Sequence, residues 1–334
     1  MGLISIVIPT QNRPDLLDEA LFSVTSQTLA PTEIIVVDDG SLPPVDALKL
    51  RRKHGETVVV LRNESARGLA FSRNLGVEAA TGDYVVHLDD DDMFAPDALE
   101  TAFSVLSNDP SQDLVFIAAV GFGSSSEHFN RVQPEAVGRV IALGAGRESA
   151  DGLIYFDHDL FKALLHSVPI AFQRVMLRRE TWHKISALRR SAYRLNPGVI
   201  DDEAAKRCIT GPLRDSEWAL YAGAVCKKTA LINRPLYLQR CAGQGYSSQP
   251  ANKGLHRQQN LIIKNQLLRA SQSLPEFRNW KSEIRDSVAT VHFDAAYALF
   301  QEGNRRQTWQ HLWQALKLRP HARYFKFAIR TLFP

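Results

Sequence analysis

The first 120 residues alternate between short apolar runs and longer segments with helical spacing. Residues 4–8 are a β-branched run, whereas the apolar residues of 15–26 recur every three or four positions, as on one face of a helix. Short buried strands that alternate with helices are typical of a parallel sheet with right-handed crossovers. We expect strands at 4–8, 33–37, 57–61, 84–88 and 114–120, and helices at 15–26, 45–52, 69–80 and 95–106.

The remainder of the chain has a different pattern. Residues 121–246 are mixed, and from about residue 252 the apolar spacing is helical, with a break at Gly303. We therefore predict an α/β fold with a mainly parallel open sheet, flanking helices and a C-terminal helical appendage. The expected division is 1–120 and 121–250, as two halves of one domain, followed by 251–334 as a helical region.

Composition supports a globular protein with a sizeable core. The chain has 334 residues, of which 45% are hydrophobic and 23% charged. Its three cysteines are odd in number and show no CxxC spacing, so we expect neither a disulfide framework nor a zinc knuckle. Residues 1–6 contain no basic leader, and no apolar run approaches the length of a spanning helix. These features predict a cytoplasmic protein.

Charge is distributed unevenly along the chain. From Ala251 onward there are 14 Lys and Arg against 5 Asp and Glu, while the preceding residues carry 26 against 31. The segment from Arg305 to the end has seven basic residues and no acidic one, with aromatic residues between them. A basic amphipathic helix is typical of peripheral contact with an anionic membrane surface. The alternative is a packed helix with a solvated basic face. No nucleic-acid motif occurs, so we expect no nucleic-acid partner.

Polar clusters follow three of the predicted strands. They are Thr10–Arg13, Asp38–Ser41 and Asp89–Asp92. In an open parallel sheet, ligands bind outside the carboxyl ends of the strands, where the strand order reverses. We therefore expect these three clusters to converge in one cleft.

The Asp89–Asp92 cluster indicates a cation site. Four consecutive carboxylates repel one another, and a divalent ion with oxygen ligands relieves that repulsion. A solvated acidic turn at a helix N-terminus is the alternative. A calcium loop is excluded, because Met93 and Phe94 stand where a ligand and a glycine are needed. Neither GxxxxGK[ST] nor GxGxxG is present, so a diphosphate at this acidic edge would need a cation.

Four motifs, in this order, resemble those of family-2 glycosyltransferases with the A-type nucleotide-sugar fold. They are Ile6–Arg13, Val36–Ser41, Gly68–Gly76 and Thr81–Asp92. The resemblance implies an inverting enzyme that moves a sugar from a nucleoside-diphosphate sugar to an acceptor hydroxyl with Mn²⁺ or Mg²⁺. The acceptor would be a saccharide or lipid-linked, in surface polysaccharide or glycolipid assembly. The donor half would be 1–120 and the acceptor and catalytic half 121–250.

The same resemblance assigns roles to individual residues. Asp91 matches the metal ligand of the DxD element, with Asp89 nearer the ribose. An ionised carboxylate can accept hydrogen bonds from a base N–H or from ribose hydroxyls, which agrees with this assignment. The positions matched to donor binding are Thr10, Arg13, Asp38, Asp39, Arg67, Asp89 and Asp90.

The catalytic base is expected in the second half. In the family it is the Asp of a Glu-Asp pair that opens a helix, and Asp215 matches it, although Arg214 replaces the preceding acid. Glu217 is the second candidate, and an N-cap is the structural alternative for Asp215. Trp218 would stack on an acceptor sugar or belong to the core. Further on, Arg240 and the Gly243–Ser247 loop would form a lid over the diphosphate or an ordinary surface loop.

Two other functions are alternatives to sugar transfer. A catalytically inactive nucleotide-sugar-binding or scaffold protein on the same fold is one, because Arg214 departs from the pattern around the base. A nucleotidyltransferase is the other. It would need a glycine-rich loop after the first strand, and Thr10–Pro14 contains no glycine.

Overall fold

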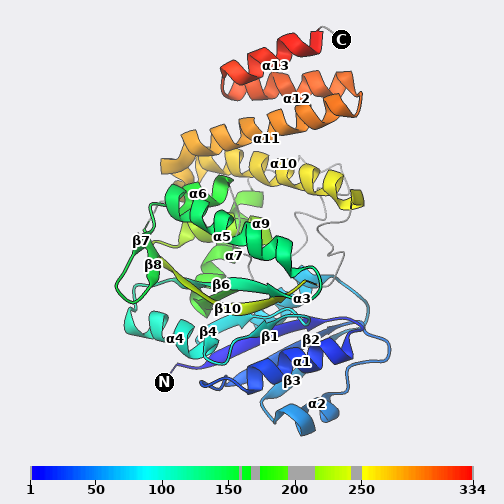
Figure 1. The fold of residues 1–334 in the computed structure, drawn as a ribbon, viewed down its shortest axis with the longest axis vertical. Coiled ribbons are helices and arrows are strands. Elements are labelled where there is room, and N and C mark those ends of the chain that lie inside the picture. Colours follow the sequence, from blue (N-terminus) through cyan, green and yellow to red (C-terminus); the bar gives the residue numbers. More distant parts are fainter. Residues whose placement is uncertain (1, 158–159, 167–173, 195–214, 242–249, 333–334) are drawn as a thin grey trace. The chain divides into compact units, whose positions relative to one another are not determined.

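The computed structural model describes residues 2–157, 160–166, 174–194, 215–241 and 250–332 (Figure 1). The chain forms two compact units. The first comprises Met1–Leu188 and Gly211–Gly243, and the second comprises Arg189–Thr210 and Gln244–Pro334. Both halves of the predicted N-terminal domain thus lie mainly in the first unit, while the second unit contains the C-terminal helices.

The first unit is built on a single ten-stranded sheet in the order β3-β2-β1-β4-β9-β6-β10-β8-β7, with β5 paired to β10. The pairs β1–β2, β1–β4, β2–β3 and β6–β10 are parallel. The strands are β1 (Ile4–Thr10), β2 (Glu33–Asp39), β3 (Val58–Asn63), β4 (Tyr84–His87), β5 (Met93–Phe94), β6 (Leu114–Phe122), β7 (Arg147–Glu148), β8 (Leu153–Phe156), β9 (Val175–Arg178) and β10 (Thr229–Arg240).

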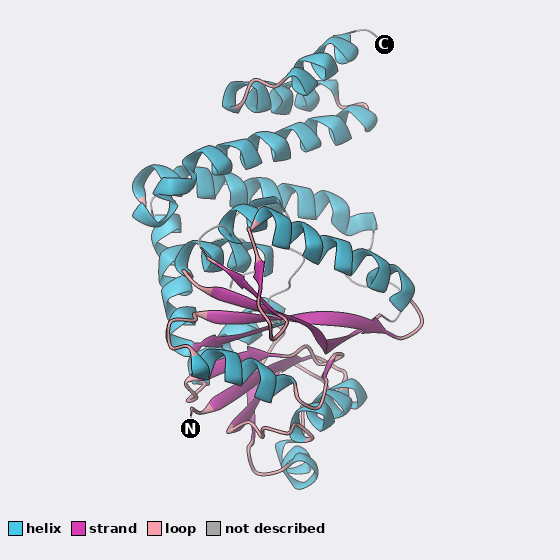
Figure 2. Ribbon diagram, turned by 60° about the vertical axis from the view of Figure 1, so that its left-hand side comes forward, coloured by secondary structure: helices cyan, strands magenta, loops and turns pink. Residues whose placement is uncertain are grey.

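Helices flank this sheet, as the magenta strands and cyan helices of Figure 2 show. At Gly76 of α3, an added Cβ would lie 2.3 Å from Cγ1 of Val7, so glycine allows this helix to approach β1 closely. The helices of the first unit are α1 (Pro14–Thr25), α2 (Ala47–His54), α3 (Leu69–Ala79), α4 (Ala98–Asn108), α5 (Ser126–Leu143), α6 (Leu160–His166), α7 (Arg179–Arg194, which continues into the second unit) and α9 (Asp215–Val225).

The predicted α/β fold is confirmed, with small shifts in two helices. Helix α2 begins after Asp46, whose side chain accepts a hydrogen bond from the Lys49 backbone N–H at 3.0 Å. Helix α4 begins at Ala98 because the residues before it pair with β10, and the Ala95 N–H donates to the Leu236 carbonyl at 2.8 Å. Tertiary pairing thus delays a helix that apolar spacing starts three residues earlier.

Four strands make the sheet mixed in a way that the sequence did not predict, because β5 and β8 are antiparallel to β10, β7 is antiparallel to β8, and β9 is antiparallel to both of its neighbours. Strand β9 lies between β4 and β6 and is antiparallel to both, with Val85 opposite Leu177 and Val115 opposite Met176. All three strands are buried there, so a short apolar run far along the chain completes the core of the sheet. The carboxyl ends of β1, β2 and β4 still meet at one edge.

The second unit is helical. Its small core contains Phe293 of α11, Leu312 of α12, and Tyr324 and Phe327 of α13. The predicted break at Gly303 is present, with a left-handed φ of +78° that favours glycine. The elements are α10 (Pro250–Ser273), the 3₁₀ helix η3 (Pro275–Trp280), α11 (Lys281–Gln301), α12 (Arg305–Leu318) and α13 (Ala322–Leu332). Within the described residues, no helix is both long and apolar enough to cross a bilayer.

A histidine pair in this unit predicts acid sensitivity. The Nδ1 atoms of His292 and His311 are 2.9 Å apart. Burial, and then the charge of His311, lowers the pKa of His292 from 6.5 to about 4. The unfolded chain therefore binds a proton at this residue that the folded chain does not, and stability is lost as the pH falls from 6.5 to 4. The loss is about 3 kcal/mol by linkage.

We expect His292→Gln to reduce this acid sensitivity, as measured by urea unfolding at a series of pH values. The exposed His183 provides the control, since His183→Gln should retain the wild-type dependence. An unchanged slope between pH 4 and 6.5 in His292→Gln would show that the pair does not contribute.

Candidate active site at the carboxyl edge of the sheet

The three predicted clusters meet, because the Asn12 N–H donates to the Ser41 hydroxyl at 3.0 Å and Thr10 contacts Asp90. Thr10 ends β1, and Asp90 follows the neighbouring β4. The Thr10 hydroxyl donates to Oδ2 of Asp90 at 2.7 Å, and both side chains are buried. This hydrogen bond joins residues 80 positions apart and fixes the acidic turn against the end of β1.

Three of the four aspartates in that turn face a common point. The Asp92 N–H donates to the Asp89 carbonyl at 3.1 Å, which closes the turn. One carboxylate oxygen each of Asp89, Asp91 and Asp92 then lies within 4.8 Å of the others. Asp90 instead bonds Thr10 and Arg13. The arrangement thus brings Asp92 into the cluster, a residue to which the sequence motif gave no role.

The electrostatics of this cluster suit a divalent cation. Burial, followed by the charge of Asp89, raises the pKa of Asp91 and raises that of Asp92 to about 7. Burial also raises the pKa of Asp90. Crowded carboxylates bind Mg²⁺ or Mn²⁺ well, because the ion offsets their repulsion and prefers oxygen ligands. The side chains present therefore fit a divalent ion.

Two arginines offset part of the negative charge. Nη1 of Arg13 lies 3.1 Å from Asp90 and 3.0 Å from Asp91, with half of the Arg13 side chain exposed. Nη2 of Arg73 lies 2.6 Å from Asp89, and the Arg73 side chain is buried. Arg73 therefore anchors Asp89 to helix α3, whereas Arg13 lies at the solvent side of the cluster.

The end of β10 supports the aspartates from the other side. The Tyr237 hydroxyl donates to Asp92 at 2.6 Å, and the Arg240 N–H donates to the same carboxylate at 2.7 Å. The Arg240 side chain also donates to the Asp91 carbonyl at 2.9 Å and to Glu19 at 2.5 Å. In these contacts Arg240 holds the acidic turn. The Gly243–Ser247 loop of the predicted lid lies outside the described residues.

Sequence reasoning missed Tyr237 and the contribution of Asp92. Tyr237 is 145 positions from Asp92, and its place in a buried strand resembles that of any core aromatic. Asp92 belonged to the recognised run of acids, but no local signal told which three would turn inward. The hydrogen-bonded turn that starts at Asp89 made that selection.

Asp38 and Asp39, the last two residues of β2, accept hydrogen bonds from the loops that follow β2 and β3. Asp38 accepts hydrogen bonds from the Ser41 and Val45 N–H groups at 2.8 and 3.1 Å, and from Arg62. Asp39 accepts from the Arg67 and Gly68 N–H groups at 2.9 and 2.8 Å, and from Asn63. Burial alone would raise the pKa of each carboxyl, but these hydrogen bonds lower it. Both aspartates are therefore ionised, well-anchored acceptors.

Arg67, predicted near the base, follows the same loop. Its guanidinium carbon lies 3.4 Å from the centre of the Phe71 ring, a cation–π contact on the first turn of α3. Asp39 fixes the Arg67 backbone, as described above. The side chain is exposed, so it lies on the surface of the molecule at the edge that carries the acidic turn.

Helix α9 carries the residues predicted for catalysis and acceptor binding. Asp215 is its first residue, and the side chain of Asp215 lies outside the described residues. Glu217 and Trp218 are each 1% exposed. Trp218 stacks on Trp182 of α7, with ring centroids 6.3 Å apart. This burial favours the core alternative for Trp218 over direct contact with a sugar.

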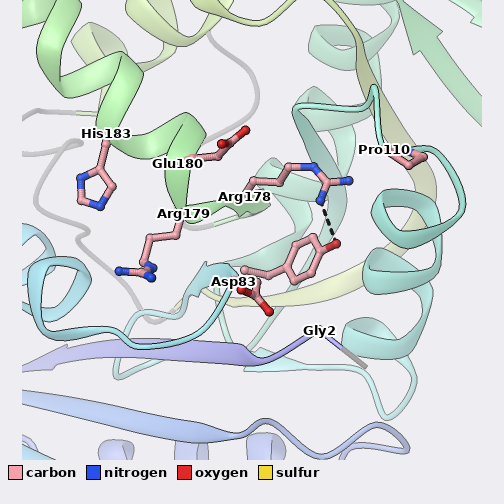
Figure 3. A pocket seen from close by; sticks show the side chains of 8 residues that line it. Gly2, Asp83, Pro110, Arg178, Arg179, Glu180 and His183 are labelled. Carbon is pink, nitrogen blue, oxygen red and sulfur yellow. Dashed lines mark hydrogen bonds between the residues drawn. The ribbon is translucent and has the colours of Figure 1, made fainter.

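A surface pocket of about 570 Å³ lies at the opposite end of the strands (Figure 3). It is lined by Gly2 before β1, Asp83 before β4, and Arg178, Arg179 and His183. Arg178 is held by the Tyr84 hydroxyl at 2.9 Å. Because the aspartates follow the carboxyl ends of the same strands, this pocket is separate from the candidate site.

Residues 5–182 match the sequence model of glycosyl transferase family 2. The chain belongs to glycosyltransferase family 2. The matched segment contains the carboxyl ends of β1 and β2 and the whole Asp89–Asp92 turn. The acidic edge therefore lies within the part of the chain that matches the family.

Curated relatives agree over a limited length. A glycosyltransferase of Haemophilus influenzae is 34% identical over 114 residues, which are 34% of this chain and 38% of the relative. YwdF of Bacillus subtilis is 43% identical over 99 residues, or 29% and 35%. A glucosyl-dolichyl phosphate glucuronosyltransferase of Haloferax volcanii is 34% identical over 109 residues, or 32% and 35%. The family-2 chain thus spans little more than a third of these relatives.

Solved structures share the fold over nearly the whole chain. Residues 1–349 of TarS from S. aureus superpose with a TM-score of 0.58 at 17% identity, covering 95% of this chain and 81% of that one. A TarS complex with UDP gives 0.56 at 16% identity, with 95% and 81% coverage. The mannosyltransferase PcManGT of Pyrobaculum calidifontis, with GDP-Man and Mn²⁺, gives 0.50 at 18% identity, with 98% and 79% coverage.

Proposed function

We propose that this family-2 glycosyltransferase moves a sugar from a nucleoside-diphosphate sugar to an acceptor hydroxyl, with inversion at the anomeric carbon. The observation that carries the proposal is the triad of Asp89, Asp91 and Asp92 at the carboxyl edge of the sheet. The named ligands of the structural neighbours, UDP, UDP-GlcNAc and GDP-Man with Mn²⁺, support this class of donor.

Asp91 and its neighbours would hold the cation, Mn²⁺ or Mg²⁺, in this proposal. A divalent ion bound there supplies positive charge that stabilises a leaving diphosphate. Asp89 and Asp92 complete the oxygen ligands. Arg13 contacts Asp90 and Asp91 from the solvent side, and so lies where a phosphate would approach.

The base and ribose of the donor would bind beside β1 and β2. Asp39 is an anchored carboxylate at the end of β2, and Arg67 flanks it on an exposed loop. Thr10, Asp38 and Asp90 fix the turns at this edge through the hydrogen bonds described above. We therefore assign these three residues an indirect role in donor binding, in which they position the turns that contact the nucleotide. Together they would orient the nucleotide with its diphosphate toward the aspartate triad.

Asp215 is our candidate for the base that deprotonates the acceptor hydroxyl. It opens α9, and a carboxylate there can accept the proton of an acceptor hydroxyl in the transition state. Glu217 is the second candidate, but its near-complete burial favours Asp215. Trp218 would shape the acceptor side from within the core.

The acceptor would be a saccharide or a lipid-linked sugar in surface polysaccharide or glycolipid assembly. The name of the Haloferax volcanii relative describes a dolichyl phosphate substrate, which supports a lipid-linked acceptor. We further propose a cytoplasmic enzyme that contacts the membrane surface through its basic C-terminal helices. An inactive nucleotide-sugar-binding protein is the second candidate, favoured by Arg214 in place of the family acid.

Thermal melting with nucleotide sugars tests the donor proposal. A ligand that binds only the folded state raises the melting temperature, and the rise grows with the logarithm of the ligand concentration relative to its Kd. We expect UDP-, GDP- or dTDP-sugars to raise it with Mn²⁺ present, and to lose the effect when EDTA is added. Free sugars that carry no nucleotide serve as the control. The proposal fails if no nucleotide sugar gives a metal-dependent rise.

A further inference from the structure

Helix α13 has three separate stripes along its length. Tyr324, Phe327 and Thr331 are buried, at i, i+3 and i+7. A second stripe at the same spacing is basic and exposed, and a third is apolar and exposed. The basic residues are Arg323, Lys326 and Arg330, and the apolar ones are Phe325, Ile329 and Leu332.

The apolar stripe is unusually open to solvent. Phe325 is 52% exposed, Ile329 59% and Leu332 62%. These three side chains recur at i, i+4 and i+7, so they form one continuous strip and not scattered surface residues. Because the buried stripe already packs α13 on Phe293 of α11, the exposed strip is not needed for the core of this unit.

Helix α12 repeats the combination, and it lies next to α13 in the chain and in Figure 1. Trp313 is 66% exposed and Trp309 37%. Arg306 and Lys317, both exposed, flank them at i−3 and i+4 along the same side of the helix. Tryptophan with neighbouring Lys and Arg is typical of surfaces that lie at the boundary of a bilayer.

The positive charge of α12 and α13 favours an anionic partner. Residues 305–332 contain seven basic and no acidic residues. Arg319 pairs with Asp286 of α11 at 2.6 Å, and the guanidinium carbon of Arg323 lies 4.6 Å from the centre of the Phe293 ring. The other five basic residues are exposed. A second copy of the same surface would place like charges opposite one another, which is unfavourable. An anionic surface with an apolar interior can pair with the basic stripe and also bury the apolar stripe.

We infer that α13, together with the Trp309–Trp313 strip of α12, docks on an anionic phospholipid bilayer. Phe325, Ile329 and Leu332 enter the headgroup boundary, and Lys326 and Arg330 contact lipid phosphates. This inference deepens the membrane contact in the proposed function by naming its surface and its lipid chemistry. It does not depend on the identity of the sugar donor.

Vesicle sedimentation of the full chain, without nucleotide sugar, tests this inference. We expect binding to vesicles of phosphatidylcholine with phosphatidylglycerol, and little binding to phosphatidylcholine alone. The double variant Lys326→Glu/Arg330→Glu should lower the partition coefficient about tenfold or more, because each basic residue near an anionic surface contributes substantially. Phe325→Ser/Ile329→Ser should lower it about tenfold while keeping the charge.

Helix α2 provides matched controls in the first unit. Lys49→Glu/Arg52→Glu reverses the same number of exposed charges, and Leu48→Ser removes a side chain that is 63% exposed. Both controls should bind vesicles like the wild type, and all variants should keep their Mn²⁺-dependent donor binding. If the α2 and α13 charge variants lost vesicle binding equally, net charge alone would explain the binding and the inference would be overturned. Self-association of the wild type that the serine variant abolishes while vesicle binding remains would also overturn it.

Discussion

Asp91→Asn is expected to lower sugar transfer by about a thousandfold, because a bound divalent ion contributes several kcal/mol and each 1.36 kcal/mol is a factor of ten. Asn keeps the shape of the side chain but removes the charge that attracts the ion. The rise in melting temperature that Mn²⁺ gives together with a nucleotide sugar should disappear as well. Turnover and thermal melting, each with and without Mn²⁺, measure the two effects.

The folding of this variant should be preserved. Asp91 lies in a cluster of like charges, so removing one charge relieves repulsion and should not lower the metal-free melting temperature, despite the lost contact with Arg13. Asp157→Asn is the control, since it removes one charge from an exposed ion pair with Arg147. Persistent Mn²⁺-dependent donor binding in Asp91→Asn would rule out the triad as the metal site.

Asp215→Asn is expected to lower kcat by about a hundredfold to ten-thousandfold, the usual contribution of a general base. Metal-dependent donor binding should remain, because the residue acts on the acceptor hydroxyl. The acidic limb of the pH profile of kcat should also disappear. Kinetics across pH, combined with donor titration of the variant, measure this result.

Glu217→Gln distinguishes a base from a structural residue on the same helix. Glu217 is buried, so its replacement should lower the melting temperature more than it changes the pH profile. If Asp215 were only an N-cap, Asp215→Asn would leave both stability and kcat nearly unchanged, because Asn caps a helix about as well as Asp. Donor hydrolysis unaffected by either substitution would favour the inactive nucleotide-sugar-binding protein.

Much of the first unit was determined by local sequence pattern. The alternation of β-branched runs with helical spacing predicts the order of β1, β2, β3, β4 and β6, because side-chain period and chain length leave few other solutions. Polar clusters at the strand ends predict the edge that carries the aspartates, since parallel strands share one carboxyl edge. Four motifs in order, Ile6–Arg13, Val36–Ser41, Gly68–Gly76 and Thr81–Asp92, indicated the family.

The sequence by itself therefore determined the fold class, the family and the acidic edge, and only the tertiary structure decided which side chains meet there. The turn at Asp89 brings Asp92 into the triad and directs Asp90 to Thr10. Strand β10 brings Tyr237 against Asp92, and packing on Trp182 buries Trp218. The physical reason is that periodicity records which face of an element is apolar, whereas contacts between distant residues depend on how those faces pack.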